Sequence, residues 1–217
     1  MVAREAAVQP HELITALAAR RLVAIVRGED PEAALDTVLT LARSGIDLIE
    51  VSLSGADALD VISQSRKALG PRALLGAGTV LTAQDAALAA EAGAAYVVTP
   101  AVTEAVAASR DLGLPVLAGA LTPTEVVAAL RAGAAAVKLF PAGPGGVELL
   151  RALRAPFPDV PFVPVGGVDV ATARDFLAAG ALAVGVGGPL VGRAADGDPT
   201  GLADRASAFR ALAEGAS

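Results

Sequence analysis

The chain has 217 residues, of which 54% are hydrophobic and 18% are charged, so it can bury a large core and is not of the disordered class. A net charge of -6 without a run of Lys or Arg argues against nucleic acid or an anionic membrane as the main partner. The chain has no cysteine, and the single His11 cannot build a histidine-rich metal site. We therefore expect a small-molecule substrate and neither a metal nor another cofactor.

Two further features of the composition bear on location and chemistry. Arg4 and Glu5 interrupt the alanines near the N-terminus, and no later stretch reaches the roughly 18 uninterrupted apolar residues of a membrane span. A cytoplasmic protein is the expectation. Only two lysines, Lys67 and Lys138, stand against fifteen arginines, so each lysine merits attention.

Short β-branched runs alternate with helix-like segments rich in alanine and leucine, a pattern typical of βα units around a parallel sheet. Eight such units favour a single (β/α)8 TIM barrel domain over residues 1–217, with a doubly wound open sheet as the alternative. The predicted strands are Leu22–Val26, Leu48–Leu53, Ala73–Ala77, Tyr96–Thr99, Val116–Ala118, Ala135–Phe140, Phe162–Val165 and Ala183–Val186.

The helices between these strands have recognisable ends. Capping residues or first-turn signals predict helix starts at Asp30, Thr82, Thr122 and Asp169. Several helical segments end in a glycine, at Gly45, Gly93, Gly113, Gly133 and Gly180, and the last four of these are the expected C′ glycines of loops that lead into the next strand. An extra N-terminal helix, Pro10–Arg21, should plug or flank the bottom of the barrel, and a last helix, Leu202–Glu214, should close the ring.

In a barrel of this kind the active site lies at the C-terminal ends of the strands. Polar residues there are therefore candidates for chemistry. They are Arg27, Glu50, Ser52, Thr79, Thr99 and Lys138, together with the glycine pairs after the seventh and eighth strands.

Lys138 lies in an otherwise apolar predicted strand, where an unpaired ammonium group is costly to bury. One interpretation is a salt bridge to a barrel carboxylate, or a side chain that reaches a wet end of the barrel. The other is an amine that burial prepares to attack a ketone. Lys67 lies in a polar helix end and should be on the surface.

Glu50 interrupts the apolar second strand, and a carboxylate inside the barrel near an ammonium group is suited to general acid/base chemistry. A structural ion pair with Lys138 is the alternative. Arg27 follows the first strand and is suited to a substrate carboxylate or phosphate, or else is a solvated loop arginine.

Glycines follow several strands where a ligand could approach the backbone. Gly78, with the Thr79 hydroxyl beside it, ends the third strand. The pairs Gly166–Gly167 and Gly187–Gly188 follow strands seven and eight, where barrels often bind phosphate through backbone N–H groups. The alternative is that these positions are tight turns that need small residues.

Seven segments in this order and spacing resemble the family of 2-keto-3-deoxy-6-phosphogluconate aldolase and its 6-phosphogalactonate and 4-hydroxy-2-oxoglutarate relatives. The resemblance runs from about Leu22 to Val191. Its segments are Val23–Arg27, Ile49–Val51, Gly76–Val80, Val98–Pro100, Leu121–Glu125, Val137–Ala142 and Pro164–Val168.

The resemblance implies a class I aldolase that cleaves a 2-keto-3-deoxy-6-phospho sugar acid, or a related 4-hydroxy-2-oxo acid, to pyruvate and an aldehyde such as glyceraldehyde 3-phosphate. In that family Lys138 would form the Schiff base and Glu50 would move protons. A homotrimer is also implied. The ligand-binding residues would be Arg27, Thr79, Gly78, Pro100, Gly166, Gly167, Gly187 and Gly188.

Three departures from the family pattern bear on the substrate. Ser54 stands where many members carry an arginine that holds the pyruvyl carboxylate. Val165 stands where a threonine often precedes the glycine pair, and this threonine is absent in the galactonate-type relatives. Gly188 replaces a serine that commonly contacts the phosphate, so a backbone N–H is kept but a hydroxyl is lost.

Two other functions stay open at this point. One is a phosphate-binding barrel isomerase or epimerase, in which Glu50 is the base and Lys138 only an electrostatic partner. The other is a non-catalytic ligand-binding barrel, in which Lys138 and Glu50 form a structural pair that apolar residues could replace.

Overall fold

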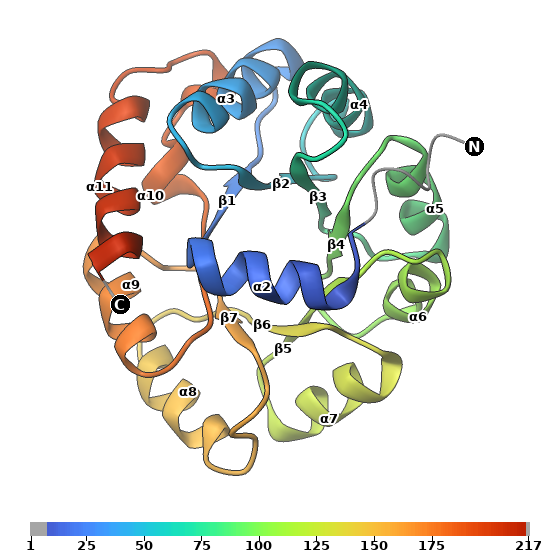
Figure 1. Ribbon diagram of the computed structural model, residues 1–217, viewed down its shortest axis with the longest axis vertical. Helices are drawn as coiled ribbons and strands as arrows, with labels where there is room; N and C mark the ends of the chain where they lie inside the picture. The colour runs from blue at the N-terminus through green and yellow to red at the C-terminus, as the bar shows by residue number, and fades with distance from the viewer. Residues whose placement is uncertain (1–7, 216–217) are drawn as a thin grey trace.

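The computed structural model describes residues 8–215, so Arg4, Glu5 and both ends of the predicted domain lie outside the described residues. Eight parallel strands curl into a barrel, and helices surround it (Figure 1). The predicted TIM barrel is confirmed. The strands are β1 (Leu22–Val26), β2 (Leu48–Ser52), β3 (Leu74–Gly78), β4 (Tyr96–Val98), β5 (Val116–Ala120), β6 (Ala136–Leu139), β7 (Phe162–Pro164) and β8 (Val184–Val186).

Strand order distinguishes the barrel from an open doubly wound sheet. The order is β7-β6-β5-β4-β3-β2-β1-β8, which follows the chain all the way round. An isolated parallel bridge between Val165 and Gly185 joins the two remaining ends, β7 and β8. All eight predicted strands are present, with ends that differ by one or two residues. β5 is longer than predicted because Gly119 and Ala120 continue its pairing with Lys138 and Leu139 of β6.

The helices alternate with the strands and lie outside them. Among the predicted starts, Asp30, Thr82, Thr122 and Asp169 all accept hydrogen bonds from the first turn of their helices. The helices are α2 (Pro10–Arg20), α3 (Pro31–Arg43), α4 (Ala58–Leu69), α5 (Ala83–Glu91), α6 (Glu104–Asp111), α7 (Pro123–Ala132), α8 (Gly146–Arg154), α9 (Val170–Ala178), α10 (Gly188–Val191), the 3-10 turn η1 (Ala194–Asp196) and α11 (Leu202–Gly215).

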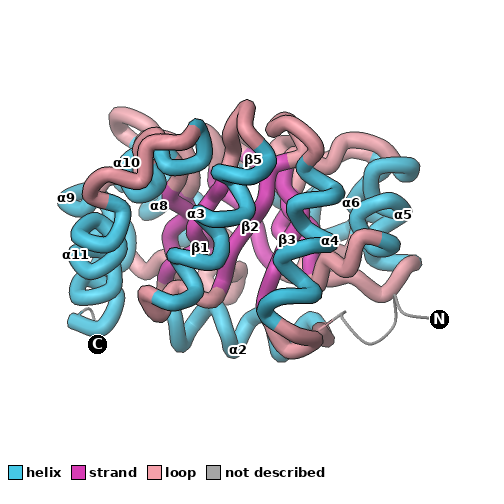
Figure 2. The backbone as a smooth tube through the Cα atoms, turned by 90° about the horizontal axis from the view of Figure 1, so that it is seen from above, coloured by secondary structure: helices cyan, strands magenta, loops and turns pink. Residues whose placement is uncertain are grey.

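Two apolar layers hold the barrel together. The outer layer lies between strands and helices, and outward strand residues such as Ile49 and Val51 belong to it. The inner layer fills the barrel and includes Val23, Leu48 and Tyr96. Leu13 and Leu17 of α2 belong to the inner layer, and Figure 2 shows α2 beneath the strands. The extra helix therefore plugs the N-terminal end of the barrel, as predicted.

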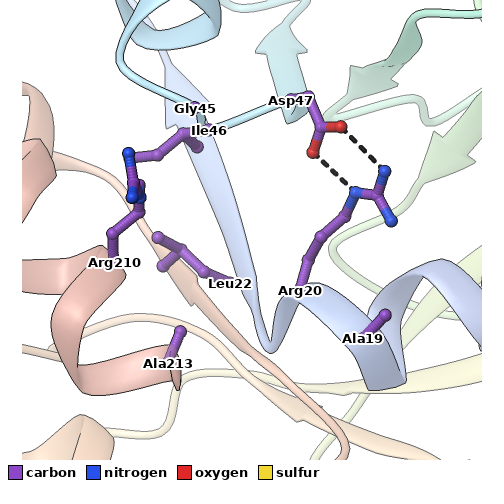
Figure 3. A pocket seen from close by; sticks show the side chains of 8 residues that line it. All are labelled: Ala19, Arg20, Leu22, Gly45, Ile46, Asp47, Arg210 and Ala213. Carbon is purple, nitrogen blue, oxygen red and sulfur yellow. Dashed lines mark hydrogen bonds and ion pairs between the residues drawn. The ribbon is translucent and has the colours of Figure 1, made fainter. Parts of the chain in front are cut away.

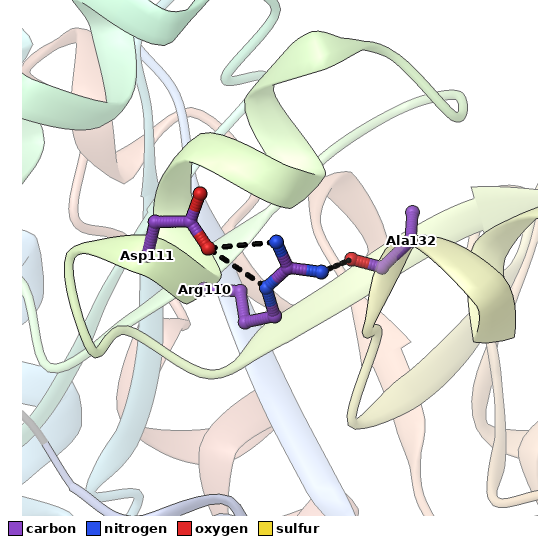
Figure 4. Close-up of polar contacts among 3 residues, drawn as sticks. All are labelled: Arg110, Asp111 and Ala132. Atoms are coloured by element: carbon purple, nitrogen blue, oxygen red, sulfur yellow. Dashed lines mark hydrogen bonds and ion pairs between the residues drawn. The ribbon is translucent and has the colours of Figure 1, made fainter.

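At this same end of the barrel, arginine side chains of one helix donate hydrogen bonds to backbone carbonyl groups at the C-terminal end of another helix. All five predicted helix-ending glycines have positive φ angles, between 81° and 95°. A helix C-terminus carries partial negative charge, so a cation there is favourable. Figure 4 shows one case, in which Arg110 contacts Asp111 at 2.7 Å and also donates to the Ala132 carbonyl. Four arginine-to-carbonyl bonds at this end reach from one helix to the C-terminal end of another: Arg66 to Gly93 (2.8 Å), Arg110 to Ala132 (3.1 Å), Arg154 to Gly180 (2.7 Å) and Arg210 to Ser44 (3.0 Å).

Candidate active site

Glu50 and Lys138 enter the barrel from opposite sides, β2 and β6. Side chains alternate along a strand, so Glu50 points inward while its neighbours Ile49 and Val51 point to the helix layer. Only 2% of Glu50 and 5% of Lys138 is exposed. Among the described residues these two are the only buried ones that carry a charge, and the barrel interior holds both.

Lys138 influences the ionisation of Glu50 without forming an ion pair with it. Burial raises the pKa of the Glu50 carboxyl above its ordinary value, and the positive charge of Lys138 opposes that rise. No salt bridge of 4.0 Å or less joins them in the part of the chain that the structure describes. The Nζ atom of Lys138 lies 5.0 Å from the centre of the Phe140 ring, a cation–π contact. The pair therefore differs from the structural ion pair that was the alternative prediction.

Gly78 makes room for the Glu50 carboxyl group. A Cβ atom at Gly78 would overlap Oε1 of Glu50, and Cγ would be 2.6 Å away. The glycine that ends β3 is therefore explained by Glu50. Whether Gly78 also contacts a ligand stays a prediction.

Three hydroxyl groups form a chain at the ends of β2 and β3. Ser52 Oγ lies 2.8 Å from Thr79 Oγ1 and 2.9 Å from Ser54 Oγ. Thr79 has a φ angle of 59°, which is rare for a β-branched residue and is typical of functional sites. Ser54, which replaces the expected arginine, therefore supports Thr79 through Ser52.

Arg27 lies at the C-terminal end of β1 with its side chain exposed. Within residues 8–215 no hydrogen bond or ion pair engages its guanidinium group. Arg27 and Ser52 line one small cavity of about 10 Å³ between the loops that follow β1 and β2. An exposed cation without a partner among the described residues thus lies at the same end of the barrel as the three hydroxyl groups and is available to an anionic group.

The predicted glycine pairs occupy different surroundings. Gly166 and Gly167 both have positive φ angles, 90° and 76°, and a Cβ atom at Gly166 would lie 3.1 Å from the Phe140 ring. Gly187 precedes the four-residue helix α10, and a side chain at Gly188 would meet no atom within 4 Å. A phosphate role for these glycines stays a prediction.

Thr99 and Pro100 follow β4. The Thr99 hydroxyl is buried and donates to the Ala101 carbonyl at 2.7 Å, so its polar group is already used. Pro100 packs closely on β5, because a Cβ atom at Gly119 would overlap the Pro100 carbonyl. The hydrogen bond of Thr99 and the packing of Pro100 are structural reasons for these residues at these positions. A ligand-binding role for Pro100 stays a prediction.

Two of the cavities outside this cluster lie at opposite ends of the barrel. One of about 480 Å³ lies between α8 and α9, and Gly167 is among its lining residues. The other, of about 140 Å³, lies at the opposite end of the barrel and is bordered by the Arg20–Asp47 ion pair of 2.6 Å (Figure 3). None of the predicted site residues lines that second cavity. Among the described residues, no group of three or more His, Cys, Asp or Glu side chains could hold a metal ion.

Sequence reasoning missed two side chains beside the pair. Phe140 was treated as the end of a strand, although it contacts Lys138. Tyr96 was named only as the first residue of a predicted strand, although its hydroxyl is buried near Glu50. The signal for Tyr96 is that it is the only tyrosine of the chain and lies at an inward position of β4.

Comparison with known proteins places the chain among aldolases. A family model described as "KDPG and KHG aldolase" matches residues 13–198. A 2-dehydro-3-deoxy-phosphogluconate aldolase of Haemophilus influenzae is 35% identical over 169 residues, 77% of this chain and 79% of that protein. A 2-dehydro-3-deoxy-6-phosphogalactonate aldolase of Escherichia coli is 35% identical over 171 residues, 78% of this chain and 83% of that protein.

Solved structures agree with these relatives. "Native KDPGal structure" has a TM-score of 0.84 and 33% identity, over 90% of this chain and 95% of that chain. The KDPG aldolase of Legionella pneumophila, with pyruvate captured as a covalent carbinolamine intermediate, has a TM-score of 0.80 and 27% identity. The match covers 97% of this chain and 98% of that chain.

Proposed function

Because the chain belongs to the KDPG and KHG aldolase family, we propose that it is a class I aldolase for 2-keto-3-deoxy-6-phospho sugar acids or related 4-hydroxy-2-oxo acids. The products are pyruvate and an aldehyde such as glyceraldehyde 3-phosphate. The observation that carries the proposal is the buried Lys138, which faces Glu50 inside the barrel without an ion pair.

The first half of the cycle builds an electron sink on Lys138. The unprotonated amine attacks the C2 carbonyl carbon of the substrate and forms a carbinolamine. Glu50 donates a proton to the departing hydroxyl group, so water leaves and an iminium ion remains. A carboxyl whose pKa is raised by burial is better suited to this donation than an ordinary glutamate.

The second half breaks the carbon chain. Ionised Glu50 accepts the proton of the C4 hydroxyl, directly or through a water molecule. The electron pair of that O–H bond forms the aldehyde carbonyl, the C3–C4 bond breaks, and its electrons pass to the enamine of pyruvate on Lys138. Protonation at C3 and hydrolysis then release pyruvate and restore the amine.

Different residues bind the two anionic ends of the substrate. Arg27 and Thr79 hold the pyruvyl carboxylate, with Thr79 supported by Ser52. Backbone N–H groups at Gly166, Gly167, Gly187 and Gly188 hold the distal phosphate. The absence of a side chain at Gly188 leaves space on that side.

Family membership favours this function over the two alternatives. An isomerase or epimerase would use Glu50 as base and would form no imine at Lys138. A non-catalytic barrel would need Lys138 and Glu50 to neutralise each other, and no ion pair joins them among the described residues. The proposal also includes a homotrimer in the cytoplasm. No helix within the described residues is long and apolar enough to span a membrane.

Trapping the imine tests the proposal directly. Borohydride reduction in the presence of pyruvate should add the mass of a reduced pyruvyl group to the peptide that contains Lys138. Lys138→Ala should abolish trapping and lower turnover by roughly 10⁴-fold or more, because the covalent intermediate is lost. Lys67→Ala is the matched control, since Lys67 is exposed on α4 and should behave like wild type. An unmodified Lys138 peptide would refute the Schiff-base mechanism.

A cleavage screen tests the substrate class. Phosphorylated and unphosphorylated 2-keto-3-deoxy acids should be compared by following pyruvate release with a coupled dehydrogenase. The proposal expects the phosphorylated acids to have the larger kcat/KM. Equal values for both forms would remove the phosphate role from the glycine pairs.

A further inference from the structure

Tyr96 places a polar atom in the middle of the barrel. Its side chain is 0% exposed, and its hydroxyl finds no hydrogen-bond partner among residues 8–215. A buried hydroxyl without a partner is costly, so such a group calls for an explanation. A phenylalanine would fill the same volume without that cost.

The strand register places Tyr96 beside Glu50. Glu50 pairs with Gly76, and Gly76 pairs with Tyr96, so the three residues lie at one level across β2, β3 and β4. Gly76, in the middle position, has no side chain. A Cβ atom at Gly76 would overlap Cζ and Cε2 of Tyr96, which shows that the ring crosses β3 toward Glu50.

The carboxyl group of Glu50 lies over the next inward position of β3. A Cβ atom at Gly78 would overlap that carboxyl group, as one at Gly76 would overlap the Tyr96 ring. Inward positions two residues apart are about 7 Å apart along a strand. A phenolic hydroxyl, one water molecule and a carboxylate oxygen fill such a span, and a turn of the carboxyl group shortens it.

The surroundings of Tyr96 leave Glu50 as its natural acceptor. Tyr96 belongs to an apolar cluster inside the barrel that includes Leu13 of α2 and the strand residues Val23, Leu117 and Val163. Within the described residues, Glu50 and Lys138 are the only buried charged groups. Burial and the negative charge of Glu50 raise the pKa of the Tyr96 hydroxyl well above its ordinary value, so it keeps its proton and remains a donor.

We propose that Tyr96 is a positioning residue whose hydroxyl donates to the Glu50 carboxylate, directly or through one buried water, and holds it toward Lys138. The inference rests on the proposed role of Glu50 as the proton-transfer group. A donor on the N-terminal side stabilises the ionised carboxylate, which is the form that accepts the C4 hydroxyl proton. Glu50 is then held between Tyr96 below and the substrate above.

The single tyrosine makes this contact measurable in the full-length protein. Tyrosine labelled with ¹³C at Cζ gives one resonance, from Tyr96 alone. As the pH rises, its shift should show one step, at the pKa of Glu50, which burial places above the ordinary value of a glutamate. Glu50→Gln should abolish the step. A shift that is flat with pH, or a step that persists in Glu50→Gln, would overturn the proposal.

Tyr96→Phe provides the kinetic test. The variant keeps the ring over Gly76 and removes only the donor, so kcat should fall roughly tenfold with KM unchanged. Loss of the donor disfavours ionised Glu50, so the acidic limb of the kcat/KM profile should move to higher pH. A wild-type profile and a wild-type kcat would show that Tyr96 only fills the core. If the variant fails to fold, the resonance experiment decides alone.

The two levels of the hypothesis can fail separately. If imine trapping fails at Lys138 but the Cζ step follows Glu50, the contact exists and the aldolase mechanism is wrong. If trapping succeeds and the Cζ shift is flat, the mechanism stands and only the role of Tyr96 is lost.

Discussion

The two ends of the barrel treat their polar side chains in opposite ways. At the N-terminal end, Arg20 pairs with Asp47, and Arg66 donates to four backbone carbonyl groups. At the C-terminal end, Arg27 has no partner among the described residues, and Thr79 is held at a positive φ angle. The N-terminal end thus uses most of these polar groups within the chain, although Arg66 Nη2 is buried without a hydrogen-bond partner among the described residues, whereas the C-terminal end holds Arg27 available to a ligand.

This difference shows where stability and function reside. Interactions satisfied within the chain stabilise the fold, and α2 adds apolar burial at the same end. Buried Glu50 and the strained Thr79 lower stability, and such costs persist in proteins where function requires them. We therefore expect substitutions at the two ends to have separable effects on activity and on stability.

Glu50→Gln should give the largest effect at the C-terminal end. Loss of the proton-transfer group should lower kcat by about 10² to 10⁴-fold. Glu91→Gln is the control, because Glu91 is exposed at the other end of the barrel, on α5, and should leave kcat unchanged. A Glu50→Gln variant with more than a tenth of wild-type kcat would exclude Glu50 from proton transfer.

The same variant should separate stability from activity as the pH changes. Burial raises the pKa of Glu50 in the folded state, so its contribution to stability is present below the ordinary pKa of glutamate. That contribution is lost as the pH rises through the raised pKa. The free energy of unfolding of Glu50→Gln, relative to wild type, should therefore increase with pH. Denaturant unfolding at several pH values measures it, and a constant difference would contradict the expectation.

Arg27→Ala should have an intermediate effect, confined to binding. The loss of a charge-assisted contact to the pyruvyl carboxylate should raise KM by about 10 to 100-fold. Thermal stability should not change, since the side chain is exposed and unpartnered in the described structure. Arg72→Ala, another exposed arginine, is the control. An unchanged KM would show that Arg27 does not bind the pyruvyl carboxylate, which the hydroxyl groups of Ser52, Ser54 and Thr79 would then have to bind.

Arg154→Met should have the smallest effect, and on stability alone. The variant keeps most of the apolar stem but loses the 2.7 Å bond to the Gly180 carbonyl, at a cost of about 1 kcal/mol in the free energy of unfolding. Steady-state kinetics should match wild type. Arg174→Met on the exposed face of α9 serves as the comparison. An equal loss in the free energy of unfolding there would show that the hydrogen bond from Arg154 to Gly180 is not responsible.

The fold could be predicted in detail because its signals are local. Strand patterning, N-caps such as Thr82 and glycines such as Gly133 depend on neighbours in sequence, and the structure confirms them. The hydrogen bonds from arginine side chains to carbonyl groups of other helices were not predicted, because residues such as Arg110 and Ala132 meet only after two helices have packed. Local signals therefore give the elements, and tertiary contacts give the bonds between them.

The candidate site was predictable where a residue type conflicts with its surroundings. Lys138 and Glu50 stand out as charges in apolar strands, and the structure brings them into the same interior. Tyr96 was missed because an aromatic residue in a strand is ordinary core, and only the register across Gly76 relates it to Glu50. Ser54 could be recognised as a departure, but its link to Thr79 through Ser52 needed the structure.

The plug formed by α2 has a consequence for the order of events in the barrel. Leu13 and Leu17 fill the N-terminal end of the barrel within the described residues, which leaves the C-terminal ends of the strands as the expected opening for a ligand. Substrate, water and products must all pass through that opening. In the proposed mechanism the pyruvyl part of the substrate is bound to Lys138, deepest in the barrel, so the aldehyde would depart before pyruvate follows.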